Sequence, residues 1–325
     1  MLSAGKIAAA VIALMAVFAP LPGMATDAYP TKPIRLIIPF PPGGTTDIVG
    51  RILGQKLSEA LGKPVVVENK PGAGGLVGTD YVAKADPDGH TLLLGNSGAL
   101  AAGLSLVPTV PYDVMRDFAP ISMISDVTIV LAVNPKVPVN TVQELVAYAR
   151  DNPGKLNVAI PSIGSMHHLL TEMFKMSAGL NLMSVPYKGS APAIVDLIGG
   201  QVQIDFDNLP ALASYIESGQ VRALAVASAE RSEFLPNVPS MKEAGFPDIV
   251  ASPWFALVAP AGTPRPIIDR LNREVVRIMQ SPEMKEQLHA QKANARWSTP
   301  EASAAFIRDE IERWAKVVKL ADIKM

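Results

Sequence analysis

The chain has 325 residues, of which 49% are hydrophobic and 18% are charged. This composition can bury large cores, so it excludes a disordered or fibrous protein, and the length favours two domains. The 29 basic and 30 acidic residues form no Lys/Arg run, and the aromatic residues are not interleaved with basic ones, so no nucleic-acid partner is expected.

The first 25 residues are predicted to be an export signal peptide. Lys6 is their only charged residue, and the apolar run 7–19 is shorter than the roughly 20 residues that span a bilayer, which favours cleavage over a membrane anchor. We place the cut after Ala25, with Ala28 as the alternative. Cleavage leaves 28 bases against 30 acids, a formal charge of −2.

The chain contains no cysteine. Disulfides, thiolate metal sites and a lipid-modified N-terminal cysteine are therefore excluded. Together with the export signal, this predicts a mature protein that is free and soluble in the periplasm.

The first part of the mature chain alternates apolar strand-like runs with helical patterns. Strands are expected at 34–39, 65–68 and 91–95, and helices at 48–61 and 72–84. This order predicts an α/β fold with a mostly parallel sheet and helices on its faces.

The same order returns about 120 residues later, with strands at 156–160, 182–186 and 202–206 and a helix at 166–178. Phe40, Pro41, Gly44 and Thr45 align with Ile160, Pro161, Gly164 and Ser165. The repeat predicts two equivalent lobes, each with a turn and a helix N-terminus at the carboxyl edge of its sheet, where ligands bind.

Two long apolar runs, 121–133 and 249–259, are predicted to cross between the lobes. Lobe 1 would then be discontinuous, comprising residues 29–128 and 253–325, and lobe 2 would comprise residues 129–252. The two crossover strands would form a hinge.

The turn in lobe 1 has the composition of an anion-binding site. Gly43 and Gly44 allow close backbone approach, and Thr45 or Thr46 is expected to cap the following helix and to offer a hydroxyl group. An ordinary capped turn, with Asp47 complementing the helix dipole, would have the same composition.

The turn in lobe 2 favours the binding interpretation, because Ser162, Gly164 and Ser165 repeat these features. Neither turn contains Lys or Arg, so the bound group is expected to be weakly charged, such as one carboxylate.

Other polar residues give weaker indications. His167 and His168 lack the spacing of a metal site, and which of them faces the cleft stays open. Asp205 and Asp207 share one face of a strand end and could act as a catalytic pair, but a structural or hydrogen-bonding role fits better without a partner acid, base or metal. No nucleophile elbow, zinc-protease motif or phosphate-binding loop is present. We therefore expect no enzyme, metal or cofactor.

Six stretches in order resemble the periplasmic substrate-binding proteins of tripartite tricarboxylate transporters, the Bug receptors: 29–34, 39–47, 68–75, 185–189, 199–202 and 259–264. The resemblance implies a two-lobed, type II-like Venus-flytrap fold that binds a small organic acid and delivers it to a membrane permease. The ligand-binding residues it implies are Phe40, Pro41, Pro42, Gly43, Gly44, Thr45, Thr46, Asn96, Ser97, Ser162, Gly164, Ser165, Met166, His167 and Asp207.

The chain departs from the family pattern in two places. Ser162 stands where a glycine is common, and Gly98-Ala99-Leu100 replaces a usual histidine-containing stretch. The ligand therefore stays open, and a smaller, less polar wall could accommodate an aromatic or aliphatic acid.

The sequence thus predicts a monomeric periplasmic solute-binding protein that closes around a mono- or dicarboxylate. Two alternatives stay open: a sensory receptor subunit for the same ligands, and, less favoured, a periplasmic hydrolase using Asp205, Asp207 or His167.

Overall fold

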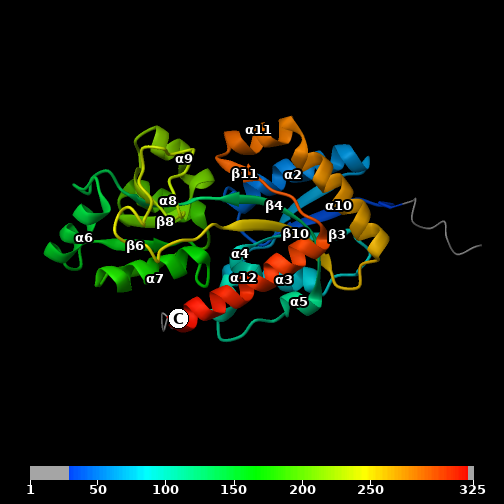
Figure 1. Cartoon of the computed structure of the whole chain (residues 1–325), viewed down its shortest axis with the longest axis horizontal. Coiled ribbons are helices and arrows are strands. Elements are labelled where there is room, and N and C mark those ends of the chain that lie inside the picture. Colours follow the sequence, from blue (N-terminus) through cyan, green and yellow to red (C-terminus); the bar gives the residue numbers. More distant parts are fainter. Residues whose placement is uncertain (1–28, 321–325) are drawn as a thin grey trace, which may run out of the picture.

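The computed structural model describes residues 29–320, and the predicted signal peptide lies outside this range. Two α/β halves lie side by side along the long axis of the molecule (Figure 1). Each half has its own sheet, one of six strands and one of five. The two-lobed α/β fold predicted from the sequence is confirmed.

The larger sheet has the strand order β11-β4-β10-β3-β1-β2. The strands β1, β2 and β3 are parallel, whereas β10 is antiparallel to β3 and β4, and β11 is antiparallel to β4. The bounds of these strands are β1 (Ile34–Ile38), β2 (Val65–Asn69), β3 (Thr91–Asn96), β4 (Phe118–Val127), β10 (Trp254–Pro260) and β11 (Ala293–Ala295).

The side chains of this sheet point alternately to its two faces, and each face packs into its own hydrophobic core. Leu36 and Ile38 are fully buried on the face that packs with α2 and α10, whereas Ile37 and Leu93 belong to the opposite core. The helical segments of this half are α2 (Thr45–Leu61), η1 (Ala73–Gly75), α3 (Leu76–Ala83), α4 (Ser97–Leu100), η2 (Ala102–Ser105), α5 (Val114–Asp117), α10 (Arg265–Gln280), α11 (Pro282–Ala290) and α12 (Pro300–Leu320).

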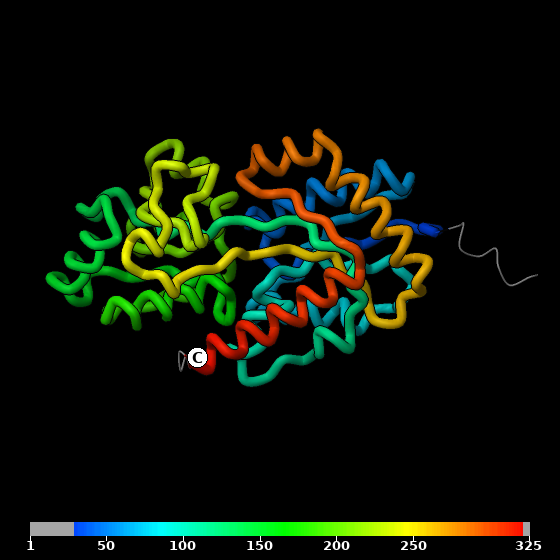
Figure 2. Tube along the Cα trace, in the orientation of Figure 1, coloured from blue at the N-terminus to red at the C-terminus, as the bar shows by residue number. Residues whose placement is uncertain are grey.

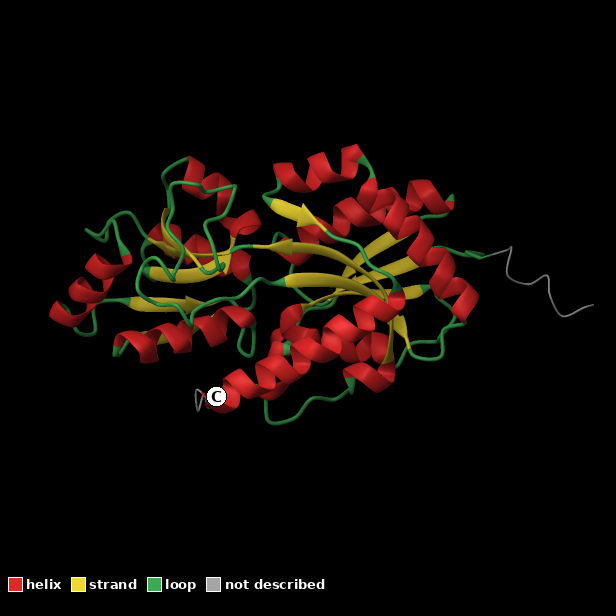
Figure 3. Ribbon diagram, in the orientation of Figure 1, coloured by secondary structure: helices red, strands yellow, loops and turns green. Residues whose placement is uncertain are grey.

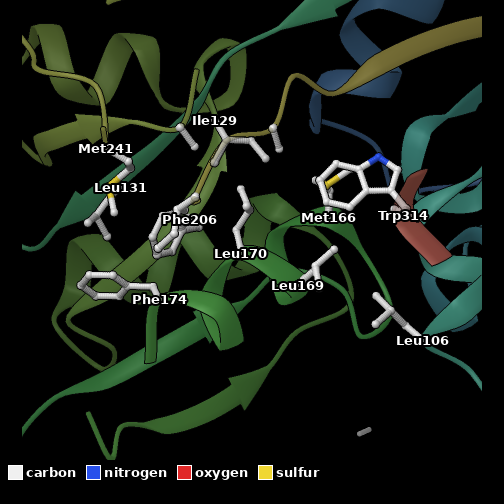
Figure 4. Packing of buried hydrophobic residues seen from close by; sticks show 14 of the residues in the cluster. Leu106, Ile129, Leu131, Met166, Leu169, Leu170, Phe174, Phe206, Met241 and Trp314 are labelled. Atoms are coloured by element: carbon white, nitrogen blue, oxygen red, sulfur yellow. The ribbon is translucent and has the colours of Figure 1, made fainter. Parts of the chain in front are cut away.

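The smaller sheet has the order β7-β6-β8-β5-β9. Its elements are β5 (Ile129–Val133), α6 (Val142–Asp151), β6 (Asn157–Ile160), α7 (Met166–Ala178), β7 (Met183–Pro186), α8 (Ser190–Gly199), β8 (Ile204–Asn208), α9 (Leu209–Glu217) and β9 (Arg222–Val226). Helices cover both faces of each sheet (Figure 3). Phe174 of α7 packs edge-on against Phe206 of β8, with ring centroids 5.7 Å apart (Figure 4).

Two segments join the halves and run side by side between them (Figure 2). The Val127 N–H donates to the Pro253 carbonyl at 3.0 Å where they pass. The first predicted crossover strand, 121–133, is split at Thr128, because β4 and β5 belong to different sheets. In the second, 249–259, the strand β10 begins only at Trp254. We propose that lobe 1 comprises residues 29–128 and 253–325, and that lobe 2 comprises residues 129–252.

The glycine-rich segment after β2 differs from its prediction. Gly72, Gly74 and Gly75 have positive φ, so the α-helix begins at Leu76, after a short 3-10 turn. Between residues 29 and 320, no helix is both long enough and apolar enough for a bilayer crossing.

Candidate functional site

A small cavity lies between the lobes, where chain segments leaving the carboxyl ends of β1, β3, β6 and β8 meet. Its volume is about 40 Å³, room for very few water molecules. The lining residues are Phe40, Pro41, Pro42, Gly44, Thr45, Thr46, Asn96, Pro161, Ser162, Ser165, His167, Gly189, Ser190, Ala191 and Asn208.

The lobe 1 wall is the N-terminus of α2. Gly44 is the N-cap and makes no side-chain capping bond, so the expectation that Thr45 or Thr46 caps the helix is wrong. An N-cap residue precedes the first helical residue, whereas α2 already begins at Thr45. The N–H groups of Thr45 and Thr46 find no backbone acceptor among residues 29–320, and the buried Thr45 Oγ1 has no hydrogen-bond partner. This wall therefore presents unpaired polar groups to the cavity.

Asp47 stabilises the turn through hydrogen bonds on the side away from the cavity. Its Oδ2 accepts hydrogen bonds from the Gly43 N–H and from Arg51 Nε, each at 3.0 Å, and its Oδ1 accepts from Asn69 Nδ2 at 2.9 Å. Burial opposes ionisation, but the hydrogen bonds from Arg51, Asn69 and Gly43 outweigh it and lower the pKa of Asp47. Asn69 also donates to the Phe40 carbonyl at 3.0 Å. The turn is thus held rigid without using the cavity-facing groups.

The lobe 2 wall contains the matching turn. Ser165 is the N-cap of α7; its hydroxyl accepts from the His168 N–H at 3.3 Å and donates to the Ser162 carbonyl at 2.6 Å. The Gly164 N–H donates to His168 Nδ1 at 3.3 Å. The two turns therefore match in position, since each leads into a helix that starts at the cavity. They differ in capping, because Ser165 caps α7 with its side chain and α2 has no side-chain cap.

Two further helices of lobe 2 start at the cavity. The N-cap of α8 is Gly189 and that of α9 is Asn208, and neither makes a side-chain capping bond. Unpaired N–H groups and the helix dipole make a helix N-terminus attractive to anions. Helices α2, α7, α8 and α9 all direct this end toward the same small space, which can hold a carboxylate without any cationic side chain. Helix α9 contributes only its dipole, because the Leu209 N–H donates to the Thr128 carbonyl and Pro210 has no N–H.

The two adjacent histidines have different environments. His167 lines the cavity, and neither of its ring nitrogens has a hydrogen-bond partner. His168 points instead to Gly164 and Glu172, and burial lowers its pKa. His167 is therefore the residue that faces the cleft.

Asp205 and Asp207 lie behind the lobe 2 wall, each 0% exposed. Asp207 Oδ1 accepts from Ser190 Oγ at 2.9 Å and from the Asn208 N–H at 2.7 Å, and it lies 3.6 Å from His167 Nε2. Neither carboxyl oxygen of Asp205 has a partner. Burial and the neighbouring Asp207 raise the pKa of Asp205 far above its usual range.

The structure brings ten of the fifteen predicted binding residues into the cavity wall: Phe40, Pro41, Pro42, Gly44, Thr45, Thr46, Asn96, Ser162, Ser165 and His167. The other five, Gly43, Ser97, Gly164, Met166 and Asp207, do not line it. Met166 is 2% exposed and its side chain belongs to the hydrophobic core (Figure 4).

Sequence reasoning missed five residues that line the cavity, namely Pro161, Gly189, Ser190, Ala191 and Asn208. The glycine after Val185-Pro186-Tyr187-Lys188 was a usable signal, because a glycine that follows a strand can precede a helix N-terminus.

Cation side chains are absent from the described lining of the cavity. Within residues 29–320, no group of three His, Asp or Glu side chains is placed to hold a metal ion. A larger open pocket, about 750 Å³, lies on lobe 1 at the opposite edge of its sheet. Its basic side chains are already paired, Lys32 with Asp88, Arg35 with Glu68 and Lys84 with Asp80, so its size alone does not make it a solute site.

Residues 49–323 match the family model described as tripartite tricarboxylate transporter family receptor. Protein BugT of Bordetella pertussis is 47% identical over 319 residues, covering 97% of this chain and 98% of that protein.

Three solved structures share the fold. Rpa4515 of R. palustris, solved with adipate, has a TM-score of 0.88 at 38% identity, and the match covers 91% of this chain and 99% of the Rpa4515 chain. The periplasmic binding protein BugD has a TM-score of 0.86 at 35% identity, with 91% and 99% covered. MatC of Rhodopseudomonas palustris, solved with malate, has a TM-score of 0.84 at 32% identity, with 89% and 100% covered.

Proposed function

Because this chain belongs to the tripartite tricarboxylate transporter receptor family, we propose that it is a periplasmic protein that captures a small organic carboxylate between its lobes and delivers it to the membrane permease of such a transporter. The members of this family and the structural neighbours are solute-binding proteins, not enzymes. The hydrolase alternative is therefore set aside.

One observation carries the proposal. Four helix N-termini from the two lobes face one cavity that has unpaired, buried polar atoms, among them Thr45 Oγ1 and the ring nitrogens of His167. Buried polar groups in proteins are almost always hydrogen-bonded, so such atoms indicate a bound partner. The adipate and malate bound by two relatives support a carboxylate as that partner.

The size of the cavity supports a cycle of opening and closing. A space of about 40 Å³ is far smaller than the 300 Å³ or more that encloses a small organic ligand. The lobes must therefore move apart for a solute to enter, and the two connecting segments at Thr128 and Pro253 are where that movement is expected. A ligand that contacts both walls stabilises the closed arrangement.

The binding step is tested by a thermal-shift screen of residues 26–325 with mono- and dicarboxylates, aromatic acids and their amides, followed by calorimetry. A ligand at a hundredfold excess over its Kd adds about 2.7 kcal/mol to the free energy of unfolding. If one acid class raises the Tm, the proposal stands; if no acid or amide does, it fails.

Delivery is tested with cells that lack this chain. If they lose uptake of the acid identified in the screen and regain it on complementation, the transport role holds. Unchanged uptake, with loss of an acid-induced transcriptional response, would favour the sensory-receptor alternative instead.

A further inference from the structure

The polar groups behind the lobe 2 wall bear on the chemistry of the ligand, given that the proposed function is correct. Asp207 is the centre of this group. The groups that face it are His167 from α7, Ser190 from α8, the backbone of Asn208, and Asp205 from the same strand. Ser190, His167 and Asn208 line the cavity, so Asp207 lies one layer behind the surface that a ligand would touch.

Of the two buried carboxyl groups, Asp205 and Asp207, it is Asp207 that carries the negative charge. Both are fully buried on one face of β8, and burial raises the pKa of each. Two such close groups do not both ionise readily. Asp207 has the donors that stabilise a charge, from Ser190 and the Asn208 backbone with His167 close by, whereas Asp205 has none. The proton therefore stays on Asp205.

This charge sets what Ser190 can offer to a ligand. The Ser190 hydroxyl has a single hydrogen, and it is donated inward to Asp207 at 2.9 Å. Toward the cavity, Ser190 Oγ is then left with lone pairs and acts as an acceptor. A second carboxylate placed there would meet an acceptor and, directly behind it, a buried negative charge, with no Lys or Arg in the described wall to compensate.

The lobe 1 wall has the opposite character. Its backbone N–H groups at Thr45 and Thr46 are unpaired, and its nearby carboxylate, Asp47, forms an ion pair with Arg51 and accepts a hydrogen bond from Asn69. The cavity is thus polarised. Unpaired N–H groups line the lobe 1 wall, whereas at Ser190 the buried charge of Asp207 opposes the attraction that the N-termini of α8 and α9 have for an anion.

We propose that Asp207 is a positioning residue for specificity: through Ser190 it selects acids with one carboxylate and, at the other end, a neutral hydrogen-bond donor such as an amide or hydroxyl group. A symmetrical dicarboxylate is then a poorer ligand than the monoamide of the same acid, which has nearly the same shape.

The test measures Kd by calorimetry for matched pairs, succinate with succinamate and adipate with adipamate. The monoamide of a pair is expected to bind at least tenfold more tightly than its diacid. Lowering the pH from 8 to 6.5, where the diacid keeps both charges, is expected to improve binding of the diacid and not of the monoamide. Burial raises the pKa of Asp207, and a proton taken up there cancels the charge behind the wall.

Variants separate this role from a merely structural one. In Asp207→Asn, the side-chain oxygen can still accept from Ser190, but the negative charge behind the wall is gone. The preference for the monoamide is therefore expected to shrink, and the pH dependence to disappear, while one of the acids still binds. Ser190→Ala removes the acceptor together with the hydrogen bond that Ser190 donates to Asp207, so it is expected to change the preference. This variant keeps the test valid if Asp207→Asn does not fold. Asp196→Asn is the matched control, because Asp196 lies on α8, as Ser190 does, accepts a hydrogen bond from Tyr187 Oη and does not line the cavity.

Acids that bind with equal affinity for diacid and monoamide, or with a preference that neither Asp207→Asn nor Ser190→Ala changes, overturn this inference and leave the proposed function intact. Absence of binding by every acid and amide overturns both.

Discussion

Replacement of Asp205 by Asn is expected to change the pH dependence of stability. Asp205 is 0% exposed, both of its carboxyl oxygens lack partners, and its neighbours across the sheet are Ala132 and Ala159. Burial and the charge on Asp207 raise its pKa, so the native state keeps a proton that the unfolded chain releases above about pH 4.

The sign follows from proton linkage. Because the native state binds more protons than the unfolded state, the free energy of unfolding falls as the pH rises from about 4 toward the raised pKa of Asp205. One proton gives a slope of up to about 1.4 kcal/mol per pH unit. At about 2–4 °C per kcal/mol, this corresponds to a loss of roughly 3–6 °C in Tm per pH unit.

The assay is thermal unfolding followed by circular dichroism between pH 4.5 and 8. Asp205→Asn removes the titrating group, so the difference in Tm between variant and unmodified protein should move in favour of the variant as the pH rises. Asp196→Asn, a change of the same kind in the same lobe, should show no such trend. Parallel curves for the Asp205 variant and the unmodified protein would refute the reasoning.

Three further predictions concern the cavity, the contact between lobes and the core. Thr45→Val should weaken ligand binding about tenfold in calorimetry with little change in Tm, because the buried hydroxyl has no partner within the protein. Gly103→Ala should weaken binding more than tenfold, lower the Tm and leave the liganded protein more open in X-ray scattering, since its Cβ would collide with the Gly164 carbonyl oxygen of the other lobe and with the Gly98 carbonyl oxygen of its own. Gly199→Ala, with open space around its Cβ, should do none of these. Glu310→Gln should lower the free energy of unfolding by about 2 kcal/mol in urea titration, because this buried carboxylate accepts hydrogen bonds from two tryptophan indoles.

The local patterns of the sequence predicted much of the fold. The strands that lead to the two turns were placed within one or two residues, because their apolar runs are bounded by Pro and Gly. Helix α7 was predicted with its observed bounds, since Ser165 and Gly179 mark its two ends. Strand β11 was missed because three residues, Ala293–Ala295, carry no periodic pattern, and their place in the sheet depends on tertiary contacts such as the pairing with β4.

The site was predicted where it depends on local chemistry and missed where it depends on tertiary packing. The turns at Phe40 and Ser165 are visible as motifs, whereas Ser190 and Asn208 reach the cavity only because α8 and α9 start at the same sheet edge. Which histidine faces the cleft was likewise undetermined, since adjacent helical residues point in different directions and the sequence does not say where the other lobe lies.

The order of strands in lobe 1 has a consequence for the newly made chain. Strand β10 lies between β3 and β4 in the sheet, yet it is made only after the whole of lobe 2, about 120 residues later than β4. Lobe 1 therefore cannot complete its core until synthesis passes Pro260. Such distant pairing slows folding, because a long loop must close before its contacts form.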